Sequence, residues 1–314
     1  MKALYFDKKV LLREMPRPQP KSDEALINVK AVGICNTDLE IIKGYMGFKG
    51  ILGHEFAGMV TECKDKHLLN KKVTGEINLG CGTCSFCLAG MKRHCPNRTV
   101  LGISGKDGAM AEYLTLPTDN LHVLPGTIDF TTAIFVEPLA AACEILEQIH
   151  IKPGQRVLVI GDGKLAALVA QVIATVNSHV TVVGISEKKV QLLKKIGINA
   201  QVNAIEQKNW DIIVECTGNS EGIQCALDYI KPRGTIILKS TYNENASINQ
   251  NLIVVNEITL IGSRCGNFDL AIEFLRKGYV KTKQLVTKVL PLAQYQEAFA
   301  YAQNPDSFKI ILEI

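Results

Sequence analysis

The chain has 314 residues and a mass of 34.4 kDa, which is enough for two domains of ordinary size. Its content of 47% hydrophobic and 21% charged residues is typical of a folded protein and argues against disorder. The net charge of +4 is spread along the chain in short lysine pairs. We therefore expect solvated helix faces and no nucleic-acid partner.

No segment of the sequence predicts secretion or membrane insertion. The N-terminus lacks a basic stretch followed by an apolar run. The longest apolar run without a charge, residues 165–176, falls short of the about 20 residues that a bilayer requires. We expect a cytoplasmic protein with no membrane partner. Ten cysteines in a reducing compartment are considered first as metal ligands.

The predicted elements change in character near the middle of the chain. Residues 1–137 hold short strand-like runs broken by Gly and Pro, such as 24–32 and 110–116. From 156 to 266, strand and helix patterns alternate, which predicts βαβ units around a parallel sheet. Strands are expected there at 156–160, 180–184, 211–216, 234–239 and 259–262, with helices at 164–176 and 188–196, and the C-terminal part adds a helix at 269–277, a strand at 285–290, a further helix and a strand at 309–314.

Four cysteines lie close together in the first part of the chain. The pattern is C-x2-C-x2-C-x7-C, formed by Cys81, Cys84, Cys87 and Cys95. Gaps of two residues let thiolates converge from tight turns, and four sulfurs close a tetrahedron around zinc with no open position. Unrelated core thiols and an iron–sulfur cluster are the alternatives, and the close spacing weighs against the first. We predict a structural zinc that holds a loop.

Further residues of metal-ligand type are dispersed along the sequence. Cys35 lies in G-I-C-N-T-D, His54 lies in G-H-E-F-A-G, and Glu137 lies in V-E-P-L. One thiolate, one imidazole and one carboxylate would leave zinc a fourth position for water or a substrate oxygen. Taken singly, they also suit a core cysteine, a structural histidine and an acid in the first turn of a helix. Spacing alone does not join the three.

A glycine-rich loop opens the region of the predicted parallel sheet. It follows the strand at 156–160 and leads into an apolar helical run. This setting is typical of a G-x-G-x-x-A turn, which places a dinucleotide pyrophosphate at a helix N-terminus. An ordinary βα turn is the alternative. The candidate cofactor-binding residues of the loop are Gly161, Asp162, Gly163, Lys164 and Leu165.

The second predicted strand of this region ends without an acid. NAD enzymes usually place an acid there to bind the ribose 2′-hydroxyl, but the residue is Gly184. Ser186 and Lys188 suit a 2′-phosphate, so NADP is favoured over NAD. Ser186 also suits a helix N-cap, and Lys188 a solvated position. Further candidate contacts at the strand ends are Thr217, Ser240 and Arg264, although a surface ion pair is an equal interpretation for the arginine.

The ordered set G-I-C-N-T-D, G-H-E-F-A-G, the four-cysteine run, V-E-P-L and G-D-G-K-L resembles the zinc-containing medium-chain dehydrogenase/reductase family. The resemblance covers nearly the whole chain and implies an α/β protein. A GroES-like, β-rich catalytic domain would comprise 1–137 and 267–314. A Rossmann domain, a doubly wound parallel sheet, would comprise 138–266. The family also suggests a homodimer or homotetramer.

The same resemblance implies roles for individual residues. Cys35, His54 and Glu137 would be ligands of a catalytic zinc, which makes two zinc ions per chain. Glu55 would be an exchangeable ligand or a support of the metal, and Asp38 would support His54. The candidate proton relay consists of Thr37, which passes the substrate proton outward, and Glu40, which stands where the family often has a histidine.

The implied enzyme is a zinc-dependent oxidoreductase. It would transfer hydride between a nicotinamide cofactor and an alcohol, polyol or sugar-type hydroxyl, reversibly to the ketone or aldehyde. A glutamate as third ligand resembles the polyol and sugar branch of the family. A biosynthetic dehydrogenase or reductase for a bulky metabolite, such as an aminocyclitol or nucleotide sugar, is an alternative that the short loops allow. A zinc-stapled binding or sensor module is the non-enzymatic alternative, and it would need a clustered basic face.

Overall fold

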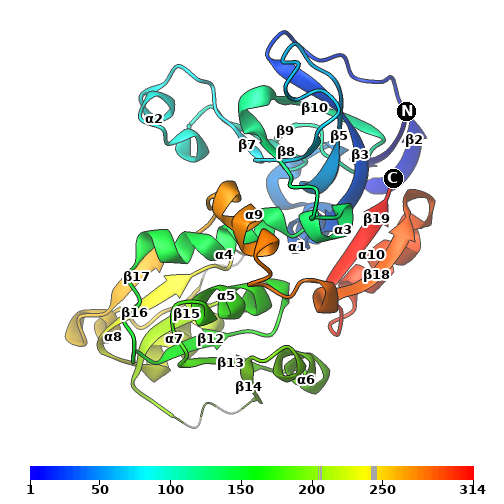
Figure 1. The fold of residues 1–314 in the computed structure, drawn as a ribbon. Helices are drawn as coiled ribbons and strands as arrows, with labels where there is room; N and C mark the ends of the chain where they lie inside the picture. The colour runs from blue at the N-terminus through cyan, green and yellow to red at the C-terminus, as the bar shows by residue number, and fades with distance from the viewer. Residues whose placement is uncertain (204, 206, 242–245) are drawn as a thin grey trace. The chain divides into compact units, whose positions relative to one another are not determined.

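The computed structural model describes residues 1–203, 205, 207–241 and 246–314, which form two compact units (Figure 1). One unit consists of Met1–Glu137 and Val286–Ile314, and the other of Pro138–Leu285. The first is mostly β-structure, and the second alternates strands and helices. The α/β class predicted from the sequence is confirmed.

The first unit contains many short strands and few helices. Apart from short 3-10 turns, its elements are β1 (Lys2–Asp7), β2 (Lys9–Glu14), β3 (Glu24–Ile34), α1 (Asn36–Ile42), β4 (Gly50–Ile51), β5 (Glu55–Glu62), β6 (Lys72–Gly75), β7 (Asn78–Leu79), α2 (Ser85–Leu88), β8 (Thr99–Leu101), β9 (Gly105–Lys106), β10 (Tyr113–Pro117), β11 (Leu121–Val123), α3 (Phe130–Ala133), β18 (Val286–Pro291), α10 (Tyr295–Gln303) and β19 (Lys309–Glu313). Helix α4 (Val136–Gln148) begins at its boundary and continues into the second unit.

Strand β3 organises the main sheet of the first unit. The strand order is β11-β6-β5-β3-β19-β18, and β10 also pairs with β3. The N-terminal half of β3 pairs with β10 and its C-terminal half with β19, while β5 runs antiparallel along the other side. Its apolar side chains pack into a core that includes Leu4, Phe56 and Ile310. The chain leaves β3 at Ile34, directly before the candidate ligand Cys35.

The second unit is a parallel sheet with intervening helices. Its elements are β12 (Val157–Ile160), α5 (Lys164–Ala174), β13 (Val180–Gly184), α6 (Glu187–Lys195), β14 (Asn199–Val202), β15 (Trp210–Glu215), α7 (Gly222–Tyr229), β16 (Ile230–Leu238), α8 (Gln250–Val255), β17 (Thr259–Gly262) and α9 (Phe268–Arg276). The order β14-β13-β12-β15-β16-β17, with every pair parallel, is that of a Rossmann sheet in which β12 comes first.

The predicted strands and helices of this region are confirmed, with β16 starting four residues earlier than expected. The central strands β12 and β13 are buried along their whole length, which explains their β-branched composition. Strand β14 is absent from the sequence-based prediction. It lies at the edge of the sheet, and only Ala200 of its N-A-Q-V sequence is buried, so it carries no clear hydrophobic pattern.

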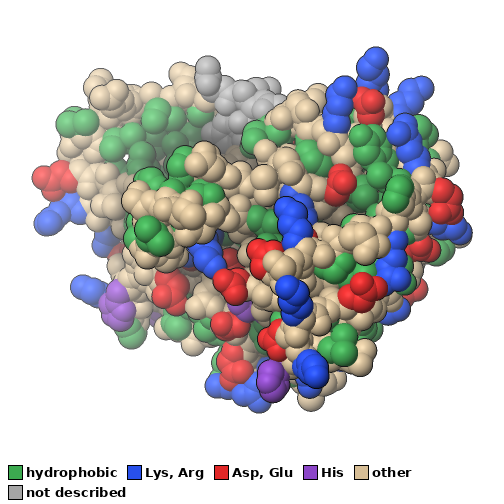
Figure 2. All heavy atoms as spheres, turned by 90° about the horizontal axis from the view of Figure 1, so that it is seen from above, with side chains coloured by type: hydrophobic (Ala, Val, Ile, Leu, Met, Phe, Trp, Pro, Cys, Tyr) green, Lys and Arg blue, Asp and Glu red, His purple; other side chains and the backbone are tan. Residues whose placement is uncertain are grey.

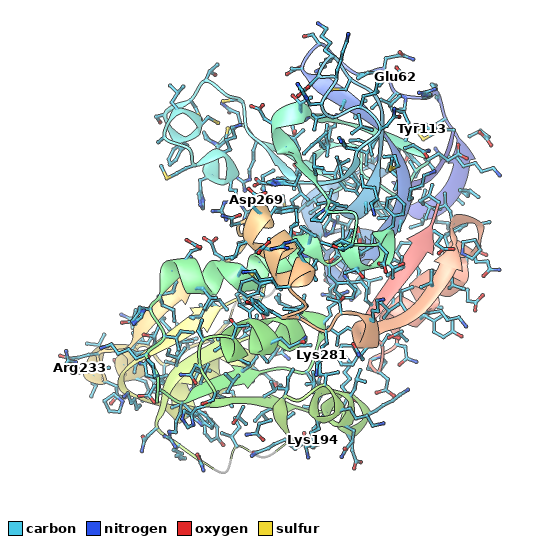
Figure 3. All side chains as sticks on the ribbon, in the orientation of Figure 1. Glu62, Tyr113, Lys194, Arg233, Asp269 and Lys281 are labelled. Carbon is cyan, nitrogen blue, oxygen red and sulfur yellow. The ribbon has the colours of Figure 1, made fainter. Side chains whose placement is uncertain are left out.

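The segment 267–285 lies with the second compact unit, whereas the sequence-based boundary assigns it to the first domain. A Cβ added to Gly266 would overlap the carbonyl oxygen of Ala140 in α4, so the chain passes very close to that helix. Lys281 lies further along the segment (Figure 3). Its backbone N–H donates to Gln171 Oε1 at 2.7 Å, and its Nζ donates to Ile196 O at 3.0 Å. These contacts fasten the segment to α5 and to the end of α6.

The surface carries charges of both signs. On the face drawn in Figure 2, Lys and Arg side chains stand among Asp and Glu side chains. Neighbouring charges of opposite sign do not build up an extended field of one sign. Among the helices that the structure describes, none has both the length and the apolar content needed to cross a membrane.

Candidate functional site

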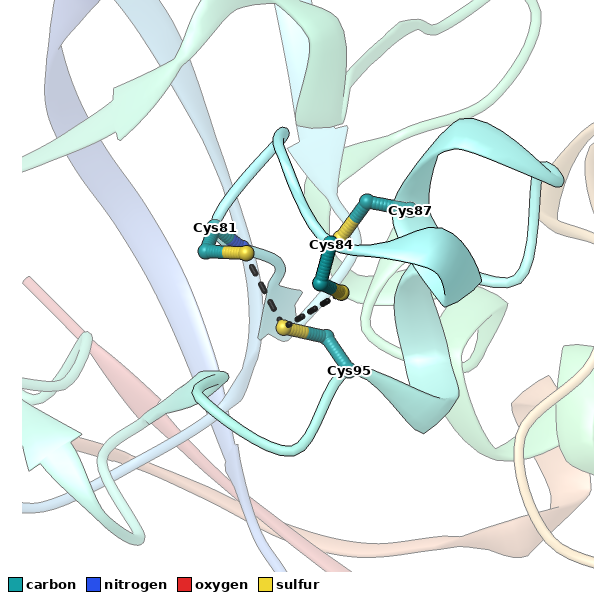
Figure 4. Close-up of side chains that lie close together, drawn as sticks. All are labelled: Cys81, Cys84, Cys87 and Cys95. Atoms are coloured by element: carbon teal, nitrogen blue, oxygen red, sulfur yellow. Dashed lines mark hydrogen bonds between the residues drawn. The ribbon is translucent and has the colours of Figure 1, made fainter.

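A lobe between β7 and β8 brings the four predicted cysteines together (Figure 4). The sulfur atoms of Cys81, Cys84, Cys87 and Cys95 all lie within 4.8 Å of one another. The two sulfurs of Cys84 and Cys95 are 3.7 Å apart. In a tetrahedral site with Zn–S bonds of about 2.3 Å, neighbouring sulfurs are about 3.8 Å apart. The four side chains therefore fit a zinc ion.

The environment of the lobe gives its thiols different proton affinities. Hydrogen bonds from the backbone and hydroxyl of Thr83 are the main reason that the pKa of Cys81 is lowered to about 6. Burial raises the pKa of Cys87 to about 11. A bound dication would be needed to keep the second thiol deprotonated at neutral pH. Glycine is required beside it, because a Cβ at Gly80 would lie 2.8 Å from Cys87 Sγ.

A second cluster forms where β3 and β5 meet. Cys35 is the N-cap of α1, and His54 and Glu55 stand at the start of β5. One ligand atom from each of these three residues lies within 4.8 Å of the other two. The antiparallel register pairs Gly33 with Glu55, and this pairing brings the loop after β3 to the loop before β5. His54 and Glu55 are 3% and 1% exposed, so solvent does not reach these two side chains.

Asp38 connects the two loops of this cluster. Its carboxylate is fully buried, and Oδ2 accepts a hydrogen bond from the backbone N–H of Cys35 at 2.8 Å. The other oxygen, Oδ1, accepts from the backbone N–H of Gly53 at 3.2 Å and lies 3.5 Å from His54 Nδ1, at the limit of a hydrogen bond. A carboxylate on Nδ1 leaves Nε2 as the ring nitrogen for a metal.

The charge balance of the cluster favours a cation. Burial disfavours the protonated imidazole of His54, but the negative charges of Asp38 and Cys35 outweigh burial, and its pKa lies well above the usual value. The same negative charges would stabilise a metal cation held by thiolate, imidazole and carboxylate donors. The residues present therefore fit a second zinc ion.

Lys309 is a member of this site that sequence analysis missed. Its Nζ pairs with Glu55 Oε2 from β19, and the side chain is fully buried. The ammonium group also lies 5.8 Å from the ring centroid of Phe135. A lysine at the first position of a C-terminal strand is ordinarily predicted to be a surface residue. Only the pairing of β19 with β3, beside β5, carries it into the site.

The other predicted residues of the metal site are placed differently. Cys35 Sγ lies 3.7 Å from Thr37 Oγ1. Glu40 lies on α1, and its Oε1 accepts a hydrogen bond from Lys43 Nζ at 2.9 Å. Glu137 is in the first turn of α4, and its carboxylate is outside the set of ligand atoms that lie within 4.8 Å of one another. Its role as third zinc ligand stays a prediction.

The loop after β12 has the geometry of a pyrophosphate site. Gly161 has φ 121°, and a Cβ there would lie 2.6 Å from Cys216 O, so only glycine allows the turn. Gly163 is the N-cap of α5, and a Cβ there would meet no protein atom within 4 Å. The loop is therefore open beside the N-terminus of α5, where anion binding requires space.

The end of β13 is covered by Asp162 from this same loop. A Cβ added to Gly184 would overlap the Asp162 side chain and lie 2.5 Å from its Oδ2. That oxygen accepts hydrogen bonds from the backbone N–H groups of Ile185 and Ser186, each at 2.7 Å. Ser186 Oγ accepts from Lys189 N at 3.3 Å and caps α6, as the alternative interpretation of that serine predicts.

Glu215 joins the ends of β15 and β16, and sequence analysis missed it as well. It is 2% exposed, and its Oε1 accepts hydrogen bonds from Thr217 N and Thr217 Oγ1, each at 2.6 Å. Ser240 Oγ donates to the same oxygen at 3.0 Å and accepts from Gly218 N at 2.8 Å. Thr217 and Ser240 are thus brought together. The backbone carbonyl oxygen of Arg264 accepts a hydrogen bond from Lys239 Nζ at 3.2 Å.

The chain is similar to known dehydrogenases in both sequence and structure. Residues 21–126 match the alcohol dehydrogenase GroES-like domain, and residues 131–314 match the glucose dehydrogenase C-terminus. Sorbitol dehydrogenase of Halalkalibacterium halodurans is 27% identical over 96% of this chain and 94% of its own length. D-arabitol-phosphate dehydrogenase of Enterococcus avium is also 27% identical, over 94% and 91%. The solved structure of an Escherichia coli short-chain alcohol dehydrogenase with NADH covers 100% of this chain and 99% of its own, at 23% identity and a TM-score of 0.92, and thus has the same fold.

A Rossmann sheet and a β-rich unit with clustered metal-type ligands define a two-domain dehydrogenase of the zinc type. The chain belongs to the zinc-containing medium-chain dehydrogenase/reductase family, and it is an oxidoreductase that uses zinc and a nicotinamide cofactor to act on CH–OH groups. The family assignment overturns the non-enzymatic alternative of a binding or sensor module.

Proposed function

We propose that the substrate is a small polyol or a sugar-derived alcohol and that the chain holds two zinc ions. The catalytic zinc would be bound by Cys35 and His54 with Glu137, and the structural zinc by the four-cysteine lobe. The observation that carries the proposal is the cluster of the half-buried Cys35 with the buried His54 and Glu55, whose loops are joined by Asp38. The names of the two relatives, a sorbitol and an arabitol-phosphate dehydrogenase, support a polyol.

The two clusters support different roles because their donor sets differ. Four thiolates complete the tetrahedral coordination of zinc, so the lobe has no position for a substrate. A thiolate, an imidazole and one carboxylate leave a fourth position for the oxygen of a substrate. A zinc ion held by these residues would supply Lewis-acid chemistry at that oxygen.

The residues of the chain would position the reacting groups and move the proton. Thr37 Oγ1, which lies beside Cys35 Sγ, would accept the hydroxyl proton of the substrate while it donates its own proton outward. Glu40 follows on the same helix, and through its exposed contact with Lys43 it would pass the proton to solvent. Lys309 would hold Glu55 beside the metal ligands. Glu55 would there support the metal site or act as an exchangeable ligand. The bound nicotinamide would supply the hydride chemistry at the substrate carbon.

The nicotinamide dinucleotide would bind along the carboxyl edge of the second unit. The loop 161–165 would receive the pyrophosphate, and Thr217 and Ser240 would lie beside the cofactor. The preference for NADP over NAD stays a prediction. One of its supports is weakened, because Ser186 serves as the cap of α6. A homodimer or homotetramer and a cytoplasmic location also stay predictions, and ten free cysteines agree with a reducing compartment.

Two measurements test the proposed function. Metal analysis of the purified protein should find about two zinc ions per chain. Assays with polyols, sugar alcohols and simple secondary alcohols, each with NAD and NADP, should give the highest kcat/KM for a polyol. The variant Cys35→Ser should lose one zinc and the activity together, whereas Cys63→Ser, outside both clusters, should lose neither. Loss of one zinc from Cys35→Ser with full activity would overturn the mechanism.

A further inference from the structure

The end of β13 carries a carboxylate that does not belong to β13. Asp162, the second residue of the glycine loop, lies over Gly184 with 9% of its surface exposed. In sheets of this order, the residue at the end of the second strand faces the adenosine ribose of the dinucleotide. Gly184 itself has no side chain, but the carboxylate of Asp162 fills the space that a side chain at 184 would occupy.

Asp162 occupies the hydrogen-bond donors that follow the strand. Its Oδ2 accepts from the backbone N–H groups of Ile185 and Ser186 at 2.7 Å each. Bonds to a charged acceptor at this length are strong. These two amides are the groups that a 2′-phosphate at this place would need. The carboxylate therefore stands in the position of such a phosphate.

The second oxygen of the carboxylate has a different environment. Oδ1 lies 3.8 Å from Lys189 Nζ, too far for a hydrogen bond. A carboxylate oxygen can accept several hydrogen bonds, and a ribose 2′-hydroxyl is a donor that matches it. A phosphate of about −1.5 to −2 charge would instead meet a carboxylate of the same sign.

We propose that Asp162 replaces the acid missing at Gly184 and makes the chain selective for NAD over NADP. This assignment rests on the proposed function only in that a nicotinamide dinucleotide binds to the second unit. The sequence favours NADP because residue 184 is a glycine. The proposal reverses that preference because the side chain of Asp162 covers this glycine in the folded protein. One hydrogen bond to a charged group corresponds to about a hundred-fold in affinity at most, and we expect discrimination of that size.

The test measures binding of two cofactor fragments and needs no zinc or substrate. Calorimetric titration of the whole protein with 5′-AMP and with adenosine 2′,5′-bisphosphate should show tighter binding of 5′-AMP, by about a hundred-fold. Asp162→Ala uncovers the two amides beside Lys189, so it should weaken 5′-AMP and strengthen the bisphosphate, bringing the ratio within about ten-fold or inverting it. Asp162→Asn, which keeps the shape of the side chain, should lie between.

A charge relocation and a matched control complete the test. The double variant Asp162→Gly with Gly184→Asp moves the acid to the strand end, where the Cβ then has room, and it should restore the preference for 5′-AMP. Glu187→Gln removes an exposed charge near the site and should leave the ratio unchanged. Equal or tighter binding of the bisphosphate by the native chain, or a ratio insensitive to Asp162→Ala, would overturn the assignment alone. Failure of both fragments to bind would contradict the proposed function as well.

Discussion

The two clusters of metal-type ligands in the first unit are built in opposite ways. The lobe draws all four ligands from one stretch of fifteen residues, 81–95, and two-residue gaps and tight turns bring them together. The other cluster joins Cys35 to His54 and Glu55 across a pair of antiparallel strands, with the buried Asp38 between the loops. A local cluster needs little of the fold and stabilises its own loop. A dispersed cluster forms only when the strands of the sheet pair.

The largest expected effect comes from the lobe. Cys84→Ser should release the structural zinc and destabilise the lobe by at least about 5 kcal/mol, because zinc bound by thiolates contributes about 10–16 kcal/mol to small folds. The lobe should then become sensitive to limited proteolysis between 81 and 95, while one zinc and part of the activity remain. Ser85→Ala, on the same short helix, serves as the control. A lobe that resists protease after Cys84→Ser would show that its turns hold without metal.

Substitution of Lys309 tests whether the ion pair between β19 and β5 stabilises the dispersed cluster. Lys309→Met should lower the free energy of unfolding by about 3–5 kcal/mol, because the buried carboxylate of Glu55 would lose the cation that pairs with it. The double variant with Glu55→Gln should recover most of that loss. Chemical denaturation of both variants provides the comparison. If the double variant is no more stable than the single one, the ion pair is not the source of the effect.

A smaller effect is expected from the carboxylate between the loops. Asp38→Asn keeps the size of the side chain but removes the charge beside His54, so zinc affinity at this cluster or kcat/KM should fall by about 10- to 100-fold. The four-cysteine lobe should retain its zinc. Asp65→Asn, at an exposed turn where the carboxylate accepts from His67 N, is the matched control. Unchanged zinc affinity and kcat/KM in Asp38→Asn would remove Asp38 from the site.

The smallest effect concerns the proton relay. Glu40→Gln removes an ion pair with Lys43 at the helix surface, so stability should change by less than about 0.5 kcal/mol. If Glu40 takes part in the relay, kcat should fall several-fold while the KM of the substrate stays constant. A kcat equal to that of the native enzyme over the whole pH range would leave Thr37 as the only candidate in the relay.

Local patterns predicted much of this molecule. The β12–α5 turn with Gly161 and Gly163, the βαβ order and the cysteine lobe follow from residues that are near one another in sequence. Strand β14 was missed because an edge strand with one buried residue has no hydrophobic pattern. Lys309 was missed because a buried charge is recognised by its partner, and its partner Glu55 comes from another part of the chain. Glu215 was missed because its contact with Ser240 forms only where the ends of β15 and β16 lie side by side.

The amino-acid sequence by itself determined the lobe, the glycine turn and the family, because spacing within a turn or a βα unit leaves few arrangements of the backbone. Tertiary structure alone decided which charges meet. The pairing of β3 with β5 and β19 placed Cys35, His54, Glu55 and Lys309 in one site. The packing of the glycine loop on β13 placed Asp162 over Gly184, where the sequence shows no acid. Charges act through distance in space, and the fold sets that distance.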